Sequence, residues 1–456
     1  MENNEIHIKD LFNEGFKEYS TYNTFRSIPS VIDGLKNGQR KCVYGVSVLA
    51  NTDKTVKVAS LAGSISSMTE YHHGETSLAD TIVGLAQGFT GSNNINIFYP
   101  DGQFGNILNP KGAAAHRYIF TRQSSAYPYI FRKEDSKILD YQMEEGKKIE
   151  PVNFYPIIPL CLVNGSKGIG TGYATNILNY DPVEIINELV GFLTGKKKKI
   201  KDKWIPHYHG FKGSIARDPE SPSRVIFKGV MKVTNTTTIE ITCLPLGISL
   251  IKYKEHLNKL EDAGFIKEYS DFSNEESFKF IVKVPRSTTN LSEEALFKKF
   301  KLESKDSENL NLWKGEHLKC YDTVREIMED FVEIRSSAYE ARRSFQLDEI
   351  KSQIDSLSEK MKFIKWYLKN SLQFTKLKKD QLIKKLEDEG FNEIDKLIRM
   401  QFFDITREQL IKLKEQIVSK KEYLKELKAT TASELWISDL KDLKTFLTKK
   451  FYKEAE

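Results

Sequence analysis

The sequence predicts a multidomain α+β protein that ends in a long antiparallel coiled coil. Three observations lead to this prediction. The 456 residues are too many for one ordinary domain and suggest two to four domains. A middle region carries β-branched and aromatic runs bounded by turn residues, which are typical of strands. The last third is rich in Lys, Glu, Leu and Ile and almost free of Gly and Pro, which is typical of long helices.

Composition excludes several classes of protein. The net charge of +6 is too small to identify a nucleic-acid binder by itself. The four cysteines lie far apart, so they form neither a zinc ribbon nor a disulfide framework, and each is expected to be buried. The N-terminus lacks the features of a signal peptide. No apolar run approaches the roughly 18 residues that cross a bilayer. We therefore expect a soluble protein of the cytoplasm.

Residues 1–25 are predicted to form a helical arm, because Ile8, Leu11, Phe12 and Phe16 recur near the helical period. Short basic and apolar segments then alternate with glycine-rich turns. This change of composition places the end of the arm near residue 25.

Residues 26–160 are predicted to contain a helix-turn-helix-like pattern. A first helix is expected around residues 56–61, with a turn at Gly63. Ser77 with Asp80 is expected to cap the second helix at its N-terminus. The apolar stripe of that second helix consists of Leu78, Ile82, Leu85 and Phe89.

Residues 161–320 are predicted to form an α+β domain with an antiparallel sheet. Its expected strands are Ser223–Phe227, Thr236–Thr242 and Phe278–Val284. A lysine run at 196–203 suits a solvated loop at least as well as a phosphate contact.

Residues 321–456 are predicted to form two long helices that run side by side. Apolar residues of the first helix recur at heptad spacing with one phase slip, and a second stripe would run back along it. The first helix would be about 70 Å long at about 1.5 Å per residue. Residues 370–405 are expected to form a small helical tip with a break at Gly390. A purely scaffolding helical bundle fits the same pattern. The stripe positions are Val324, Ile327, Phe331, Ile334, Ala338, Ala341, Phe345, Ile350, Ile354, Leu357, Met361, Ile364 and Leu368, then Leu410, Leu413, Ile417, Leu424 and Leu427.

One segment suggests covalent chemistry. A tyrosine phenol has a pKa near about 10, so it is a poor nucleophile at neutral pH unless cations stabilise its oxyanion. Arg117 stands directly before Tyr118, and Ala113–Ala115 would let a DNA backbone approach closely. A tyrosine with a structural role fits the local sequence equally, because the chain has 20 tyrosines.

Two other segments suit phosphate. His72 and His73 are adjacent and point in different directions, so they do not form a metal site. At the mouth of a DNA-binding helix, a histidine can donate to phosphate or act as a general base; a hydrogen-bonded turn with one buried imidazole is the alternative. The turn at 33–41 brings several cations to a probable helix start, which suits phosphate or an ordinary basic surface. Those cations are Lys36, Arg40 and Lys41.

The glycine-rich run at 164–172 is not a nucleotide loop, because its spacing fits neither the P-loop nor the dinucleotide pattern. The chain also contains no Asp-x-Asp pair. An isolated Ile169 among glycines suits a wedge between base pairs.

In their order along the chain, these motifs resemble the breakage–reunion domain of type IIA DNA topoisomerases. The likeness runs from about residue 10 to about residue 440. It rests on Arg-Ser-Ile-Pro-Ser at 26–30, Asp-Gly-Leu-Lys-x-Gly-Gln-Arg-Lys at 33–41, Lys-Val-Ala-x-Leu-Ala at 57–62, Tyr-His-His-Gly-Glu at 71–75, Gly-Ser-Asn-Asn at 91–94, Gly-Gln-Phe-Gly at 102–105, Ala-x-Arg-Tyr-Ile-Phe at 115–120 and Asn-Gly-x-x-Gly-Ile-Gly-Thr-Gly at 164–172.

The resemblance implies a fold and a set of roles. It implies a winged-helix DNA-cleavage domain over 26–160, a tower domain over 161–320, and a coiled coil with a dimerising C-gate over 321–456. Tyr118 would be the nucleophile and Arg117 its phosphate-binding neighbour. Arg40 and His73 would stabilise the transition state and help to move the tyrosine proton. The implied DNA contacts are Lys36, Lys41, Lys57 and His72, with Ile169 as the intercalating wedge.

The same resemblance implies an activity and partners. The chain would cut and rejoin double-stranded DNA through 5′-phosphotyrosyl links, as a homodimer, in an ATP-dependent enzyme that relaxes or decatenates DNA. Mg²⁺ and ATP would both be bound by partner subunits that carry the ATPase and Toprim domains and dock through the arm. The spelling at 71–75 resembles phage and eukaryotic members, and the chain is most similar to the medium subunit of T-even-type bacteriophage enzymes, which implies the host cytoplasm.

Two departures and two alternatives accompany this resemblance. Asn37 stands where proline is usual, and His116 stands where relatives carry a small residue. A non-enzymatic, DNA-organising winged-helix and coiled-coil dimer would explain the basic turn and the heptads, although it would not explain the Arg117–Tyr118 pair. A degenerate homologue that binds without cutting is the other alternative.

Overall fold

The computed structural model describes residues 8–374, 378–401 and 404–453, and it confirms a mixed α+β protein. Two compact units are present: Met1–Arg335 with Ile437–Glu456, and Ser336–Trp436. The first seven residues of the predicted arm, and 375–377 and 402–403 of the predicted tip, lie outside the described residues. Over the described ranges, every helix is too short or too polar to span a lipid bilayer.

The arm is helical from Ile8 to Ser27, as predicted. It consists of α1 (Ile8–Asp10), a π-helical segment (Leu11–Phe16) and α2 (Lys17–Ser27). Its apolar side chains at positions 8, 11, 12 and 16 are all exposed. The arm therefore carries a helical apolar stripe that its own unit leaves open to solvent.

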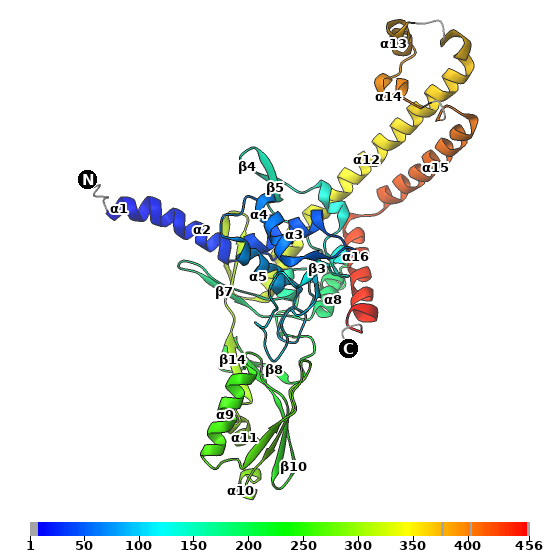
Figure 1. Ribbon diagram of the computed structural model, residues 1–456. Helices are drawn as coiled ribbons and strands as arrows, with labels where there is room; N and C mark the ends of the chain where they lie inside the picture. Colours follow the sequence, from blue (N-terminus) through cyan, green and yellow to red (C-terminus); the bar gives the residue numbers. More distant parts are fainter. Residues whose placement is uncertain (1–7, 375–377, 402–403, 454–456) are drawn as a thin grey trace. The chain divides into compact units, whose positions relative to one another are not determined.

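Three helices and a small sheet follow the arm (Figure 1). The helices are α3 (Asn37–Leu49), α4 (Val58–Met68) and α5 (Glu75–Ala86). The antiparallel sheet has the order β1-β3-β2, with β1 at Val56–Lys57, β3 at Phe120–Gln123 and β2 at Phe98–Asp101. Apolar faces of all three helices are buried, and the predicted stripe positions Leu78, Ile82 and Leu85 are part of this core.

Two details of the predicted helix pair are wrong. Gly63 lies inside α4 and forms no turn. A Cβ atom at that position would make ordinary van der Waals contact, 3.4 Å from Glu75 Oε1, so the packing of α5 on α4 does not depend on this glycine. Ser77 does not cap α5, because the N-cap is Gly74 with a φ of +85°. Glycine adopts such a φ without strain, so the helix begins at Glu75.

Two hairpins and several short helices lead out of this first region. The hairpins are β4 (Tyr141–Glu144) with β5 (Lys147–Pro151), and β6 (Ser166–Ile169) with β7 (Ala174–Ile177). The helices are α6 (Tyr127–Ile130), a 3-10 turn (Lys133–Lys137), α7 (Leu160–Val163) and α8 (Pro182–Leu193). The second hairpin carries Ile169 at its turn end.

The middle region contains the predicted antiparallel strands. Its larger sheet has the order β10-β11-β13-β12, and a smaller one has the order β14-β9-β8. All three strand predictions are confirmed by β9, β11 and β13, although Thr236 lies in the turn before β11. The strands are β8 (Ser214–Asp218), β9 (Ser221–Lys228), β10 (Val230–Asn235), β11 (Thr238–Cys243), β12 (Glu268–Asp271), β13 (Phe280–Lys283) and β14 (Glu303–Ser307).

Helices cover one face of the larger sheet (Figure 1). Tyr253 and Leu257 of α9 (Leu250–Asp262) and Leu296 of α11 (Glu293–Lys299) pack on Ile241 and Phe280 of the sheet. The short α10 (Arg286–Thr289) precedes α11, and the hairpin β15 (Leu310–Lys314) with β16 (His317–Tyr321) ends the region. Cys320 is exposed on that hairpin, so the expectation of four buried cysteines is wrong there.

Carboxylates pair with much of the lysine run at 196–203. Lys197 pairs with Glu188, Lys201 with Glu184, and Lys199 with Asp202. These ion pairs involve three of the six lysines of the run, and residues 196–199 are exposed, which is in keeping with the solvated-loop interpretation.

The long helices are α12 (Val324–Phe374) and α15 (Arg407–Ala429), and α12 extends about 76 Å at about 1.5 Å per residue. Their packed segments in the second unit run antiparallel, because Arg343 Nε donates to Thr430 O at 2.7 Å and Lys420 Nζ donates to Gln353 Oε1 at 2.6 Å. Ile350, Ile354, Ile417 and Leu427 form the buried seam. Three predicted stripe positions, Ala341, Phe345 and Leu368, are exposed.

The tip between them contains α13 (Lys379–Asp388) and α14 (Ile394–Ile398). Gly390 has a φ of +72° and breaks the chain between these two helices, as predicted. After α15 come α16 (Ala432–Phe446) and a final π-helical segment (Leu447–Phe451).

Candidate active site

Tyr118 stands on an exposed loop directly before β3. Its side chain is 67% exposed, and the Arg117 guanidinium carbon lies 5.0 Å from the centre of its ring. Among the described residues, no group hydrogen-bonds the Tyr118 hydroxyl; the backbone N–H of Tyr118 donates to Ala115 O at 2.8 Å. The phenol is therefore open to an incoming group, with a cation beside it.

The backbone around Tyr118 is fixed by the start of α4. Val58 N donates to Ile119 O at 3.0 Å, and Ala59 N donates to His116 O at 3.1 Å. The first N–H groups of a helix have no partner inside the helix and carry its partial positive charge. The segment of Tyr118 thus supplies carbonyls to the positive end of α4, while the side chains of Arg117 and Tyr118 are exposed.

Two neighbours extend this group. Lys57 pairs with Phe120 across β1 and β3, and its exposed amine lies 6.0 Å from the Phe120 ring centre. His116 Nε2 lies 3.1 Å from Asp80 Oδ1 of α5, which ties the segment to a second helix. His116, the unusual residue before the Arg-Tyr pair, therefore has a structural partner.

The histidine pair joins a second group. The His73 Nε2 atom and the Tyr22 hydroxyl of α2 lie 2.5 Å apart, and the two rings stack at 5.8 Å. Burial lowers the pKa of His73 below its ordinary value of 6.5, and the charges of Arg26 and His72 lower it further. His73 is therefore neutral at neutral pH and able to accept a proton. His72 is exposed and lies 3.7 Å from Glu144 Oε1.

Arg26 and Tyr22 are residues that the sequence interpretation missed. Arg26 stands one helical turn after Tyr22, with its guanidinium carbon 5.8 Å from that ring centre. The signal was present in the Arg-Ser-Ile-Pro-Ser motif, whose first residue is Arg26.

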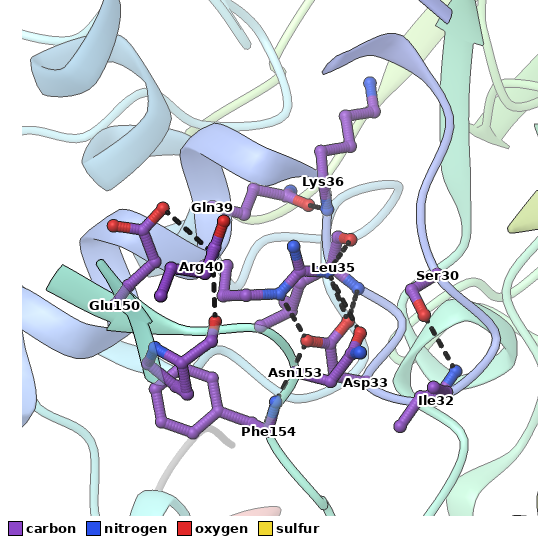
Figure 2. Close-up of polar contacts among 12 residues, drawn as sticks. Ser30, Ile32, Asp33, Leu35, Lys36, Gln39, Arg40, Glu150, Asn153 and Phe154 are labelled. Carbon is purple, nitrogen blue, oxygen red and sulfur yellow. Dashed lines mark hydrogen bonds and ion pairs between the residues drawn. The ribbon is translucent and has the colours of Figure 1, made fainter. Parts of the chain in front are cut away.

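Arg40 occupies a different environment from the predicted one (Figure 2). It is 2% exposed, and its guanidinium donates to Asp33 Oδ2 at 2.6 Å, to Asp33 Oδ1 at 3.1 Å and to Leu35 O at 3.2 Å. Asp33 also accepts the backbone N–H of Phe154 at 3.1 Å. The pair braces the turn before α3 against residues 153–154, so the Arg40 guanidinium is buried in the fold instead of facing a phosphate at the surface.

Lys41 is buried as well. Its amine donates to Thr69 O at 2.6 Å and lies 2.8 Å from Glu150 Oε1. Lys36 is half-buried at the N-cap of α3, and its amine donates to Lys167 O of β6 at 2.6 Å. Burial lowers the pKa of this amine below its ordinary value. Of the three cations in the turn, only Lys36 reaches the neighbourhood of the Ile169 hairpin.

Ile169 is 79% exposed at the end of β6, where it pairs with Ala174 of β7. The hairpin packs closely on the arm: a Cβ atom at Gly168 would stand 1.9 Å from Ser27 O. Glycine at position 168 is therefore required for this approach, and the apolar side chain next to it is held out from the surface.

The described parts of the chain contain no cluster of three or more His, Cys, Asp or Glu that would suit a metal ion. The described residues thus present an exposed phenol with an arginine beside it, and a histidine whose pKa is lowered.

Comparison with known proteins gives consistent results. A family model for the A-type subunit of DNA gyrase/topoisomerase IV matches residues 26–441. The mitochondrial DNA topoisomerase 2 of Dictyostelium discoideum is 36% identical over 472 aligned positions, which cover 98% of this chain and 35% of that protein. DNA topoisomerase 2-alpha of Homo sapiens is 36% identical over 394 positions, covering 84% of this chain and 25% of that protein.

A solved structure is also similar. The DNA-binding, cleavage and re-ligation domain of Plasmodium falciparum topoisomerase II matches with a TM-score of 0.90 and 34% sequence identity, covering 98% of this chain and 65% of that one. The chain spans about a third of the length of the curated relatives that it matches most fully.

Proposed function

This chain belongs to the type IIA DNA topoisomerase family, in the group of the gyrase and topoisomerase IV A-type subunits, and we propose that it is the DNA-cleaving and rejoining part of such an enzyme. One structural observation supports the proposed cleavage chemistry. Tyr118 offers an exposed hydroxyl beside Arg117, on a backbone segment that the start of α4 holds in place.

The proposed reaction is a transfer of one phosphodiester bond. The Tyr118 oxygen attacks a backbone phosphorus, the phenolic proton leaves, and the 3′-oxygen departs and is protonated to a 3′-hydroxyl. DNA remains attached through a 5′-phosphotyrosyl ester. Because one ester replaces another, the reverse attack by the 3′-hydroxyl reseals the strand without a high-energy cofactor. Arg117, beside the Tyr118 ring, is the cation proposed to neutralise the charge that develops on the phosphate.

His73 is the best-supported proton-transfer group. Its lowered pKa keeps the ring neutral, which is the form that accepts a proton from a phenol. Arg26, whose charge acts on His73, takes over the role that the sequence interpretation assigned to Arg40. The Arg40 guanidinium is occupied by Asp33 and supports the fold.

The proposed DNA contacts are the exposed Lys57 and His72, and the half-buried Lys36 beside the β6 hairpin. Lys57, His72 and Lys36 are candidates for backbone phosphates, whereas the buried amine of Lys41 is removed from the set. Ile169 is proposed as the wedge that enters a base step and bends the cut segment.

The finer architecture is part of the proposal. We assign α3–α5 with β1–β3 to a winged-helix domain, the two larger sheets with α9–α11 to a tower domain, and α12 with α15 to a coiled coil whose tip forms a dimerising gate. Two chains would then cut the two strands.

Cofactors and partners are also proposed. We propose that Mg²⁺ and ATP are bound by ATPase/Toprim subunits, and that the exposed apolar stripe of the arm is one docking surface for them. We also propose that the assembly works in the cytoplasm, which is the host cytoplasm if a phage encodes it. Similarity to the T-even-type medium subunit stays a prediction.

A covalent trapping experiment tests the function. Native enzyme, purified with its partner subunits, is mixed with supercoiled plasmid, Mg²⁺ and ATP and stopped with detergent, and protein on 5′ DNA ends is measured. We expect an adduct with the native chain and with Tyr423→Phe, an exposed tyrosine of α15, and none with Tyr118→Phe. An adduct that persists in Tyr118→Phe contradicts the nucleophile; a native chain that binds without an adduct supports the non-enzymatic or degenerate alternatives.

A further inference from the structure

We propose that Tyr22 of the arm is a positioning residue for His73, so that the arm forms part of the cleavage site and is more than an attachment segment. The inference rests on the proposed function and extends it, since nothing in the reaction above assigns a role to Tyr22.

The contact joins two segments that are far apart in sequence. Tyr22 lies in α2, and His73 lies 51 positions later in the loop before α5. The hydroxyl and the imidazole Nε2 are within hydrogen-bond distance, and the two rings stack with an interplanar angle of 30°. Tyr71 packs its edge on the same imidazole, with ring centres 5.5 Å apart. His73 is thus held between an arm tyrosine and a loop tyrosine.

Hydrogen bonding through Nε2 decides which nitrogen is left for DNA. For Nδ1 to accept a proton, the ring proton of neutral His73 must reside on Nε2, so Nε2–H donates to the Tyr22 hydroxyl oxygen. Nδ1 then carries the free lone pair. Among the described residues this is the hydrogen bond that the His73 side chain makes, so Nδ1 is the nitrogen through which His73 acts on the tyrosine or the phosphate.

The charged groups around His73 come from α2, from the loop before α5 and from the β4–β5 hairpin. Arg26 stands in α2 beside Tyr22, and His72 is the neighbour in the loop. Glu144 of β4 faces His72 at 3.7 Å, and Lys147 of β5 pairs with Glu70 at 2.7 Å at the start of the same loop. Within the described chain, only Tyr22 hydrogen-bonds the imidazole itself, so Tyr22 is the group that fixes its orientation.

Coupling between the arm and cleavage follows from this arrangement. The apolar stripe at the beginning of the arm is exposed, whereas Tyr22 near its end bonds to His73. A partner that seats the arm also sets the position of Tyr22. Docking and the orientation of His73 are therefore linked through one helix.

The test uses the native enzyme with its partner subunits and a labelled DNA duplex that is cleaved in a single turnover. Tyr22→Phe keeps the ring and removes the hydroxyl, and Tyr19→Phe alters an exposed tyrosine of the same helix. We expect Tyr22→Phe to slow cleavage about five- to tenfold, the loss of one hydrogen bond at a reacting group, with the dissociation constant for DNA unchanged. Tyr19→Phe is expected to cleave at the native rate.

A double-mutant cycle separates positioning from folding. In a His73→Ala background, Tyr22→Phe is expected to cause no further loss, because its effect passes through the imidazole. The acid limb of the cleavage pH profile is expected to move to lower pH in Tyr22→Phe, because the hydroxyl oxygen that accepts from Nε2–H, and so favours the protonated ring, is gone.

Three results would contradict either the positioning role of Tyr22 or the proposed function. A native rate for Tyr22→Phe, or an equal further loss in the His73→Ala background, contradicts the positioning role and leaves the proposed function intact. Failure of the native enzyme to form any 5′ adduct contradicts the proposed function itself.

Discussion

At the scale of single residues, burial separates cations that look alike in sequence. Arg40, Lys41 and Lys36 lie within six positions, yet Arg40 and Lys41 are paired with buried carboxylates and Lys36 reaches the β6 hairpin. Glu150, the partner of Lys41, is more than 100 positions away, so no local pattern reveals it. Asp33 lies in the same motif as Arg40, seven positions before it. The ion pair between these two residues could therefore have been predicted from the sequence.

This difference gives a stability prediction. Arg40→Ala leaves the Asp33 carboxylate buried without its cation, and removing one member of a buried pair costs about 3–5 kcal/mol. We expect urea unfolding of Arg40→Ala to give a clearly lower free energy of unfolding than that of the native protein. Lys57→Ala, at an exposed position, is the control and is expected to keep the free energy of unfolding near the native value. A stable Arg40→Ala protein that fails to cleave DNA would instead restore the catalytic interpretation of Arg40.

Tyr118 shows how much of the site could be predicted from the local sequence. The Arg-Tyr pair predicts an activated phenol, and the structure exposes that phenol beside its arginine. Tyr22 and Arg26 escaped prediction because their importance depends on a contact with the loop at residue 73, which only the folded chain supplies.

At the scale of elements, the spacing of apolar residues predicted whether a segment is a helix or a strand better than it predicted where that segment begins and ends. The strands β9, β11 and β13 and the antiparallel long helices were predicted from alternation and heptads. Helix starts were less predictable, since Gly74 replaces Ser77 as the cap of α5 and Gly63 continues α4. Gly74 has a φ of +85°, which glycine adopts without strain, and a single glycine such as Gly63 does not by itself end a helix.

The β6–β7 hairpin gives an element-scale prediction. Ile169→Ala removes an exposed apolar side chain, so we expect unchanged stability but weaker bending of bound DNA and slower cleavage. Fluorescence transfer between the ends of a labelled duplex measures the bend. Ile251→Ala, at an exposed isoleucine of α9, is the matched control. Native bending in Ile169→Ala would rule out the wedge.

At the scale of the whole molecule, each chain carries one Tyr118, so a double-strand break needs two copies. We expect mixed enzyme, made from native and Tyr118→Phe chains, to trap nicked circles, because one active hydroxyl cuts one strand. Gel analysis of detergent-stopped plasmid distinguishes nicked from linear DNA. A mixture of native and Tyr423→Phe chains is expected to give linear DNA. Linear products alone in the first mixture would contradict one cut per chain.

The antiparallel register of α12 and α15 limits how the lengths of these two helices can change among related proteins. Arg343 meets the end of α15 at Thr430, and Gln353, ten residues further along, meets Lys420, ten residues further back. An insertion in one helix shifts every later pair out of register unless the other gains the same number of residues. Relatives whose helical arms differ in length should therefore carry matched insertions, two at a time, preferably in steps that keep the seven-residue repeat in phase.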